Sequence, residues 1–275
     1  MNDQYRKNGF YAWILFSIWP FLAAVTAFRN FNRQWAKNIF WAFCVFYGLS
    51  FAFGSENEGS DINRYVNELD RLYDVEMSLY EAQLYFQESE EVDVLRTVIA
   101  VSLSRVTDNP IFLTMIFGAI FGFFFSRNIW YVFDRLQGKL LPITLILLAC
   151  FFMVNPIWKI NGFRMWTATH IFIFGLLPYL CEGKKHMLIF CFGSMLVHFS
   201  FILPVIVLAS YMIFGNRLVF YFCFFIISSF IAEIDITMFN DIINSYLPEA
   251  FQERSSAYRG VETVEEFGTS VSDNN

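Results

Sequence analysis

The chain has 275 residues, of which 56% are hydrophobic, 20% aromatic and only 16% charged, and its formal net charge at pH 7 is −6. A soluble domain of this length has no interior that could bury 36 phenylalanines. The composition therefore excludes soluble enzymes, nucleic-acid-binding proteins and small secreted domains stapled by disulfides, and it predicts a membrane protein.

Long stretches without Asp, Glu, Lys or Arg predict the membrane-spanning helices. The first five are 17 to 21 residues long, about the length at which an α-helix crosses a hydrocarbon layer of roughly 30 Å. We therefore predict an all-α, polytopic membrane domain over residues 1–232, followed by a partly disordered acidic tail at 233–275. The spans are expected at 9–28, 38–55, 109–126, 140–158, 164–181, 187–201, 202–214 and 218–232.

The first apolar stretch also has features of a secretory signal peptide, because Arg6 and Lys7 precede it and small residues at 25–27 resemble a cleavage site. Cleavage there would leave the basic segment 29–37 on the outer side of the membrane. Basic loops are typically cytoplasmic, so we interpret 9–28 as a span.

The uneven distribution of charge predicts the orientation of the chain. Segments 29–37, 127–139 and 182–186 carry more Lys and Arg than acids, which is typical of cytoplasmic loops. Residues 56–96 hold twelve acids against three arginines, and the tail from Glu233 holds nine against two. We therefore expect the N-terminus, the acidic loop and the acidic tail to lie outside.

The outer loop at 56–108 is too long for a simple connection and contains two helical patterns. The first is amphipathic, includes Arg64 and Glu68 as an i, i+4 pair, and is expected to lie on the membrane surface. The second, at 92–106, leads to the span that begins at Pro110. Their apolar faces comprise Ile62, Tyr65, Val66, Leu69, Leu72 and Tyr73 in the first, and Val94, Val98 and Val101 in the second.

The charge-free run from His186 to Asn216 decides the number of helices. A single helix of that length would be about 46 Å long, which is about half as long again as the membrane core. Pro204 interrupts the run, and Ser200 offers a partner for backbone groups freed there, so we predict two helices and eight spans in total. Seven spans would put the acidic tail inside and Arg217 outside, which fits the charges less well.

The sequence contains no sign of a cofactor or metal site. All five cysteines fall within predicted spans at long spacings, and none forms a CxxC pair. Signatures of serine hydrolases, phosphate-binding loops, zinc proteases and DxD glycosyltransferases are also missing. Any chemistry must therefore use scattered residues near the membrane face.

Two basic groups are expected to converge in depth at the outer leaflet. Lys159 and Arg164 bracket a short outer turn, and His198 lies about 20 Å up its helix from the cytoplasmic side. A guanidinium can grip phosphate oxygens in a fork, and a histidine with a near-neutral pKa can remove a proton from a sugar hydroxyl. The pattern favours an anionic, lipid-linked substrate, although Arg164 also suits a headgroup anchor and His198 and His170 also suit packed polar residues.

The order of these features resembles the EpsG family of Wzy-type polysaccharide polymerases. The likeness covers residues 1 to about 232 and depends on four short patterns and their placement against the spans. They are Gly59-Ser60-Asp61, Tyr65, Asn161-Gly162-Phe163-Arg164 and His198-Phe199-Ser200.

The resemblance implies polymerisation of oligosaccharide repeat units carried on undecaprenyl pyrophosphate, yielding exopolysaccharide, capsule or O-antigen at the outer face of the bacterial inner membrane. His198 is the expected general base, with Asp61 as its competitor. The partners implied are the lipid-linked oligosaccharide, membrane lipids, a repeat-unit flippase and a chain-length regulator. The substrate-binding residues would be Arg64, Tyr65, Asn161, Arg164 and Ser200.

The chain departs from the family pattern in three places. Gly54 and Ser55 stand where relatives commonly carry an arginine, and Met165 follows Arg164 where a glutamine is expected. Relatives also tend to continue with further spans, so the resemblance implies a short or truncated member. A polysaccharide or lipid transporter, a membrane acyltransferase and a non-enzymatic membrane protein are the alternatives. Apart from Arg164 at the outer end of its span, the predicted spans contain no charged residue, which argues against the transporter.

Overall fold

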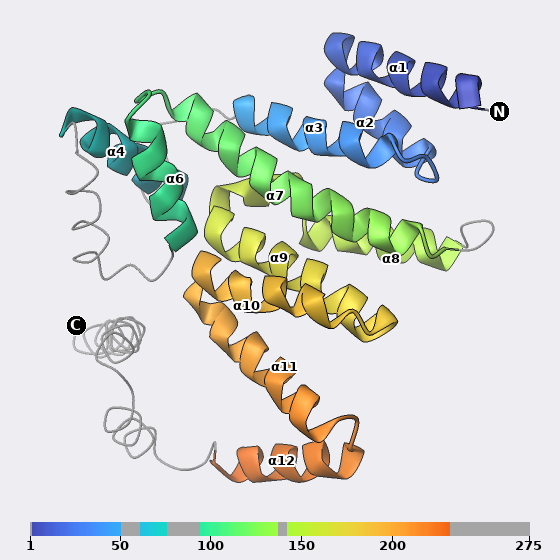
Figure 1. Ribbon diagram of the computed structural model, residues 1–275, viewed down its shortest axis with the longest axis vertical. Helices are drawn as coiled ribbons and strands as arrows, with labels where there is room; N and C mark the ends of the chain where they lie inside the picture. Colours follow the sequence, from blue (N-terminus) through green and yellow to red (C-terminus); the bar gives the residue numbers. More distant parts are fainter. Residues whose placement is uncertain (1, 51–60, 76–93, 137–141, 232–275) are drawn as a thin grey trace, which may run out of the picture. The chain divides into compact units, whose positions relative to one another are not determined.

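The computed structural model describes residues 2–50, 61–75, 94–136 and 142–231, and every regular element in these ranges is a helix (Figure 1). The chain divides into two compact units, Met1–Val207 and Leu208–Asn275. The α-helices are α1 (Asn2–Ile18), α2 (Pro20–Arg29), α3 (Ala36–Leu49), α4 (Asp61–Asp74), α6 (Val94–Ser104), α7 (Pro110–Phe133), α8 (Pro142–Val154), α9 (Phe163–Glu182), α10 (Leu188–Val197), α11 (Ile202–Phe214) and α12 (Leu218–Ile231). The 3₁₀ helices are η2 (Ile157–Gly162), η3 (Lys185–Met187) and η4 (Phe199–Phe201).

The segment predicted as one span at 9–28 consists of two helices. α1 ends at Ile18 and α2 begins at Pro20, which is the first residue of the new helix. A proline has no backbone N–H and fixes its own φ, so it is well suited to the first helical turn and poorly suited to the middle of a long helix. α1 and α2 pack against each other and against α3.

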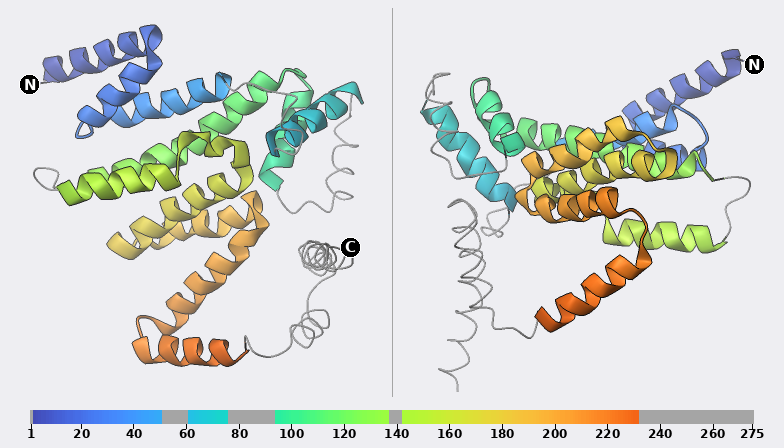
Figure 2. Two further views of the ribbon diagram at one scale, coloured as in Figure 1. Left: turned by 180° about the vertical axis from the view of Figure 1, so that it is seen from behind. Right: turned by 60° about the horizontal axis from the view of Figure 1, so that its bottom comes forward.

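α3 and α7 lie side by side and pack at very short range (Figures 1 and 2). A Cβ atom added at Gly48 would lie 2.4 Å from the carbonyl oxygen of Thr114, and one added at Gly118 would lie 2.6 Å from that of Cys44. Gly48 thus lies next to Thr114, and Cys44 lies next to Gly118, so the two helices run antiparallel. Gly118 and Gly122 form a GxxxG pattern, which lets helix backbones approach closely in a membrane.

Phenylalanines of α7 form the centre of the core in the first unit. Phe117, Phe121 and Phe125 are fully buried, one helical turn apart. Phe163, the first residue of α9, stacks on Phe117 with ring centroids 3.9 Å apart. The start of α9 is therefore held against the start of α7.

α7 continues past its predicted end at 126 and includes Arg127. The guanidinium of Arg127 lies over the rings of Trp41 and Phe123, at 5.1 and 4.2 Å from their centroids, and donates to Oδ1 of Asn38 at 3.0 Å. Aromatic faces and an amide thus accommodate a cation near the helix end.

The two helices predicted around the short outer turn are present as α8 and α9. The turn itself is η2, and the axes of α8 and the η2–α9 segment are bent by 45°. α9 also packs closely on α10, because a Cβ atom at Gly175 would lie 2.6 Å from the carbonyl oxygen of Met187.

The predicted break in the 186–216 run is present, but it lies earlier than expected. α10 ends at Val197, and His198 has extended backbone angles, φ −150° and ψ 120°. Pro204 lies in the first turn of α11, where its missing N–H costs little. In the second unit, Gly215 has a φ of +63° and separates the end of α11 from α12.

The described parts of the outer loop contain two helices, α4 and α6, as predicted, but α4 does not present its apolar face to the membrane. Ile62, Tyr65 and Leu69 belong to the core cluster of the first unit, and α4 packs on α6, α7 and η2. The predicted apolar face of α6 was wrong in part, because Val94 and Val98 are exposed. The helix instead buries Arg96, Thr97, Ile99, Ala100, Val101, Leu103 and Ser104.

Among the described residues, Pro110–Phe133 is the one helix long and apolar enough to cross a membrane by itself. Pro142–Val154 and Ile157–Glu182 meet the same criterion as a bent pair. The remaining apolar helices are shorter, so the count of eight spans stays a prediction. The tail at 233–275 lies outside the described residues.

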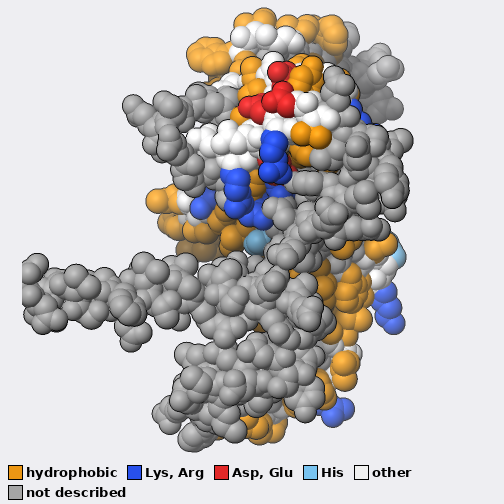
Figure 3. Space-filling model, turned by 90° about the vertical axis from the view of Figure 1, so that its left-hand side faces the viewer, with side chains coloured by type: hydrophobic (Ala, Val, Ile, Leu, Met, Phe, Trp, Pro, Cys, Tyr) orange, Lys and Arg blue, Asp and Glu red, His pale blue; other side chains and the backbone are white. Residues whose placement is uncertain are grey.

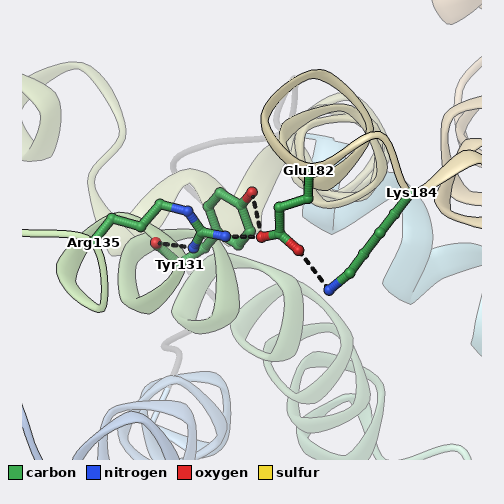
Figure 4. Close-up of polar contacts among 4 residues, drawn as sticks. All are labelled: Tyr131, Arg135, Glu182 and Lys184. Carbon is green, nitrogen blue, oxygen red and sulfur yellow. Dashed lines mark hydrogen bonds and ion pairs between the residues drawn. The ribbon is translucent and has the colours of Figure 1, made fainter.

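The segments predicted to be cytoplasmic lie at one end of the first unit. Trp130 Nε1 donates to the carbonyl oxygen of Phe31 at 2.9 Å, which links the end of α7 to the loop after α2. At the same end, Tyr131 of α7 and Arg135, two residues past the end of α7, both contact the carboxylate of Glu182, which ends α9 (Figure 4). The structure thus agrees with a common side for these segments.

Candidate functional site

Tyr65 is the centre of a polar cluster at the opposite end of the first unit from Glu182. The side chain of Tyr65 is 1% exposed and is enclosed by α4, α6, α7 and the start of α9. Three guanidinium carbons, those of Arg64, Arg96 and Arg164, lie 5.5, 5.1 and 5.7 Å from the centroid of its ring. Cations at this distance from an aromatic ring are attracted by its quadrupole.

Tyr65 also orients Arg164 directly. Nε of Arg164 donates to the hydroxyl of Tyr65 at 2.9 Å. A hydrogen bond donated by Nε–H fixes the plane of a guanidinium, whose donors form a rigid fork. Two of the predicted substrate-binding residues, 99 positions apart in the sequence, are thus brought into contact.

Arg96 belongs to this cluster, and sequence reasoning missed it. Its side chain is 2% exposed and forms an ion pair with Glu68 of α4, whose side chain is 12% exposed. The predicted partner of Glu68 was Arg64, one turn away on the same helix. The available signal was that Arg96 is the one charged residue in the otherwise uncharged segment 94–104.

Two buried oxygen atoms close to Arg164 in the sequence have no hydrogen-bond partner among the described residues. They are Oδ1 of Asn161, in η2, and Oγ1 of Thr167, one turn along α9 from Arg164. Buried polar atoms without partners are uncommon in folded proteins, and they often mark a place where a ligand or water binds. Asn161 was a predicted site residue, whereas Thr167 was not.

His198 and Ser200 lie where α10 ends. Nε2 of His198 and Oγ of Ser200 are 3.2 Å apart. The neighbouring Val197 packs in one cluster with Ala168 of α9 and Leu95 of α6. The break after α10 is therefore adjacent to the helices that carry Arg164 and Arg96.

The face at this end of the molecule is mixed in charge. Figure 3 shows lysine and arginine side chains gathered there, with acidic side chains on one side of them and a histidine on the other. Burial raises the pKa of Asp70 in α4, and the negative charges of Asp108 and Asp74 raise it further. Asp61 is the first residue of α4, and its side chain lies outside the described residues.

His170 is not part of this cluster. Its side chain is 1% exposed and packs against Phe121 and Phe125, with ring centroids 5.2 and 4.8 Å away. Nδ2 of Asn128 donates to its backbone carbonyl oxygen at 2.8 Å. The interpretation of His170 as a packed polar residue agrees with these contacts.

Comparison with known proteins assigns the chain to a family. Residues 39–268, which are most of the chain, match the model of the EpsG family. The chain belongs to the EpsG family. No curated protein and no solved structure matches it.

Membership confirms the resemblance that the sequence motifs indicated. EpsG proteins form a membrane family, and the family implies a function of the polysaccharide-polymerase type. The family match covers α4, α6, α9 and α10, so every residue of the Tyr65 cluster and the His198–Ser200 pair lies within it.

Proposed function

We propose that this EpsG protein polymerises oligosaccharide repeat units linked to undecaprenyl pyrophosphate, at the outer face of the bacterial inner membrane. The products would be exopolysaccharide, capsule or O-antigen chains. A flippase would supply the repeat units, and a chain-length regulator would act on the product. The observation that supports this proposal best is the convergence of three arginines on Tyr65, with Arg164 oriented by the tyrosine hydroxyl.

The cluster suits a pyrophosphate in charge and in geometry. Arg64, Arg96 and Arg164 carry three positive charges, while Glu68 supplies one negative charge within the cluster. A guanidinium donates two parallel hydrogen bonds to a phosphate, which a lysine cannot do. The oxygens of Asn161 and Thr167 would accept hydrogen bonds from sugar hydroxyls next to the phosphates.

His198 is proposed to remove the proton from the acceptor hydroxyl. The hydroxyl oxygen attacks the anomeric carbon of the donor sugar, the bond from that carbon to the pyrophosphate oxygen breaks, and the lipid pyrophosphate leaves. General-base help of this kind contributes about 10²- to 10⁴-fold to the rate. Ser200, 3.2 Å from Nε2, would keep the imidazole in place.

Binding of farnesyl pyrophosphate to the purified chain in lipid nanodiscs tests the first step without knowledge of the sugar. We expect saturable binding that Arg164→Lys weakens at least tenfold, because the charge is kept and the fork is lost. Arg105→Lys is the matched control, since Arg105 is an exposed arginine at the end of α6. Equal weakening by both variants would contradict a specific site.

Polymerisation in proteoliposomes tests the reaction itself, with the lipid-linked repeat unit of the host as substrate. Wild-type protein should yield a ladder of chain lengths on a gel, and Arg164→Lys should yield unextended repeat units. Movement of the substrate across the bilayer without any extension would favour the transporter instead.

A further inference from the structure

A half-buried cation lies on α7, towards the end of the first unit away from the Tyr65 cluster. Arg127 follows Pro110 by about 26 Å along the helix, at 1.5 Å per residue. A hydrocarbon layer of roughly 30 Å that begins at Pro110 would end about one turn beyond Arg127. The guanidinium therefore lies at the depth where acyl chains meet headgroups, in the leaflet that the charge distribution predicts to be cytoplasmic.

Neutral groups hold the guanidinium of Arg127 in place. Nη2 donates to Oδ1 of Asn38 at 3.0 Å, and Nη1 donates to Oγ of Ser126 at 2.9 Å. The guanidinium carbon lies 4.2 and 5.1 Å from the ring centroids of Phe123 and Trp41. None of these four side chains carries a charge, so they orient the cation without neutralising it.

Three of the five N–H groups of Arg127 have no partner among the described residues. They are Nε–H and the second N–H of each terminal nitrogen. Nε is not one of the buried atoms that lack a partner, and the side chain is only half-buried, so the surface gives access to Nε–H. In the described part of the chain, no acid forms an ion pair with Arg127. A cation in such an apolar setting is stabilised by an anion.

The surface next to Arg127 is apolar on the side of the membrane interior. Phe123 precedes Arg127 by one helical turn, and its side chain is 36% exposed. Its ring contacts those of Trp41 in α3 and Phe174 in α9, with centroids 6.0 and 6.5 Å apart. A ligand held by Arg127 thus meets aromatic rings towards the hydrocarbon and headgroups in the other direction. An anionic head attached to an acyl chain fits this combination.

The charges beyond Arg127 favour a ligand with a net negative charge. Arg135 and Lys184 share the single carboxylate of Glu182, to which Tyr131 also donates (Figure 4). Arg127 adds a third positive charge at this end of the unit. A zwitterionic headgroup would bring its own ammonium group towards this excess of cations, whereas an anionic headgroup would reduce the excess.

We propose that Arg127 binds the phosphate of an anionic phospholipid. Two of its open N–H groups donate to two phosphate oxygens, and an acyl chain of the lipid lies over the exposed ring of Phe123. The site is independent of the function proposed above, because it shares no residue with the Tyr65 cluster.

Photolabelling of the full chain in nanodiscs of phosphatidylcholine tests the site. The probe is phosphatidylglycerol with a diazirine near the headgroup end of one acyl chain, and labelled peptides are identified by mass spectrometry. We expect labels around Phe123 and Trp41. Unlabelled phosphatidylglycerol should displace the probe at about tenfold lower mole fraction than zwitterionic phosphatidylethanolamine. Inorganic phosphate in the buffer should not displace it, because free phosphate lacks the chain that packs on Phe123.

Variants of Arg127 separate this site from general attraction between lipids and surface cations. Arg127→Gln should weaken labelling about tenfold, and Arg127→Lys should give an intermediate level, because the charge is kept and the fork is lost. Arg217→Gln is the matched control, since Arg217 is an exposed arginine predicted on the same side of the membrane; its labelling should equal that of the wild type.

The competition in the wild-type protein decides the matter even if Arg127→Gln fails to fold. Equal displacement by phosphatidylglycerol and phosphatidylethanolamine would overturn the proposal, and so would equal weakening in Arg127→Gln and Arg217→Gln. Displacement by inorganic phosphate would assign the site to the free anion and overturn the assignment to a lipid.

Discussion

At the scale of single residues, the hydroxyl of Tyr65 is the smallest group on which the candidate site depends. It accepts a hydrogen bond from Nε of Arg164, while the ring of Tyr65 lies against three guanidinium groups. A phenylalanine would keep the ring and its volume but would release the guanidinium. Orientation and charge can therefore be tested separately at this position.

Tyr65→Phe should weaken binding of farnesyl pyrophosphate about tenfold and leave thermal unfolding of the protein little changed. A hydrogen bond to a charged group contributes about 1.5–3 kcal/mol, and here part of it serves to orient Arg164. Tyr73→Phe on the same helix is the control, since its side chain is 42% exposed. Unchanged affinity in Tyr65→Phe would mean that the hydroxyl does not orient the ligand-binding group.

Arg96 and Glu68 form a nearly buried ion pair, and removal of one partner alone should destabilise the protein. Arg96→Met removes the cation that is paired with the nearly buried carboxylate of Glu68, so we expect a loss of about 3–5 kcal/mol in unfolding free energy. The double variant Arg96→Met, Glu68→Leu should recover most of that stability. Thermal unfolding measures the stability of each variant, and a binding assay measures its affinity for farnesyl pyrophosphate. If the stable double variant fails to bind, Arg96 contributes to the ligand site as well as to stability.

His198→Ala should reduce polymerisation about 10²- to 10⁴-fold while binding of farnesyl pyrophosphate stays close to that of the wild type. The reason is that a general base acts on the acceptor hydroxyl and not on the pyrophosphate. Asp61→Asn is the comparison, because Asp61 is the competing base. Normal polymerisation by His198→Ala together with loss in Asp61→Asn would exchange the two roles, and normal activity of both would count against the polymerase.

At the scale of elements, the closest helix contact depends on glycines and should fail when they are replaced. Gly48→Ala and Gly118→Ala each place a Cβ within 2.6 Å of a backbone oxygen of the facing helix, so α3 and α7 must move apart. We expect each to cost about 1–3 kcal/mol in unfolding free energy. Gly193→Ala is the matched control, because nothing lies within 4 Å of a Cβ there; equal losses in control and test variants would contradict the close packing.

Hydrophobic stretches predicted most helices well, and the exceptions have local causes. α9 and α11 begin and end within a residue of the predicted spans. Gly162 and Glu182 bound the apolar run of α9, whereas α11 was predicted from Pro204 and Ser200 near its start and Gly215 at its end. The break before α2 was missed because an apolar run conceals a proline that starts a new helix. The α4 face was assigned to the membrane because an apolar stripe has the same spacing whether lipid or protein covers it.

At the scale of the whole molecule, the sequence predicted the family, but not how the candidate site residues meet. Arg164 and Tyr65 were predicted separately, and their contact requires α4 to fold back onto the start of α9. Arg96 was missed because burial of a cation is visible only when its partner is known. The role of Thr167 depends likewise on tertiary packing, which no motif encodes.

The orientation in the membrane remains a prediction that involves the entire chain. The inner loops hold nine Lys and Arg in about 30 residues, while the outer segments hold ten in about 109, about a threefold difference in density. The hydrogen bond from Trp130 to Phe31 and the ion pair between Arg135 and Glu182 agree with a shared side for three of these loops. These contacts are the same in either orientation, so cysteine labelling is the measurement that tests which side is cytoplasmic.

Labelling of single cysteines, introduced into a variant without the five native cysteines, should determine the membrane orientation in intact spheroplasts. Ser89→Cys and Asn275→Cys should react with a membrane-impermeant maleimide, since the acidic loop and tail are expected outside, and Asn216→Cys should react only after lysis. Protection of Ser89→Cys would reverse the orientation and move Arg164 and His198 to the cytoplasmic face, away from an outer substrate. Protection of Asn275→Cys alone would support seven spans, because one span fewer after the outer loop places the tail inside while the Tyr65 cluster stays outside.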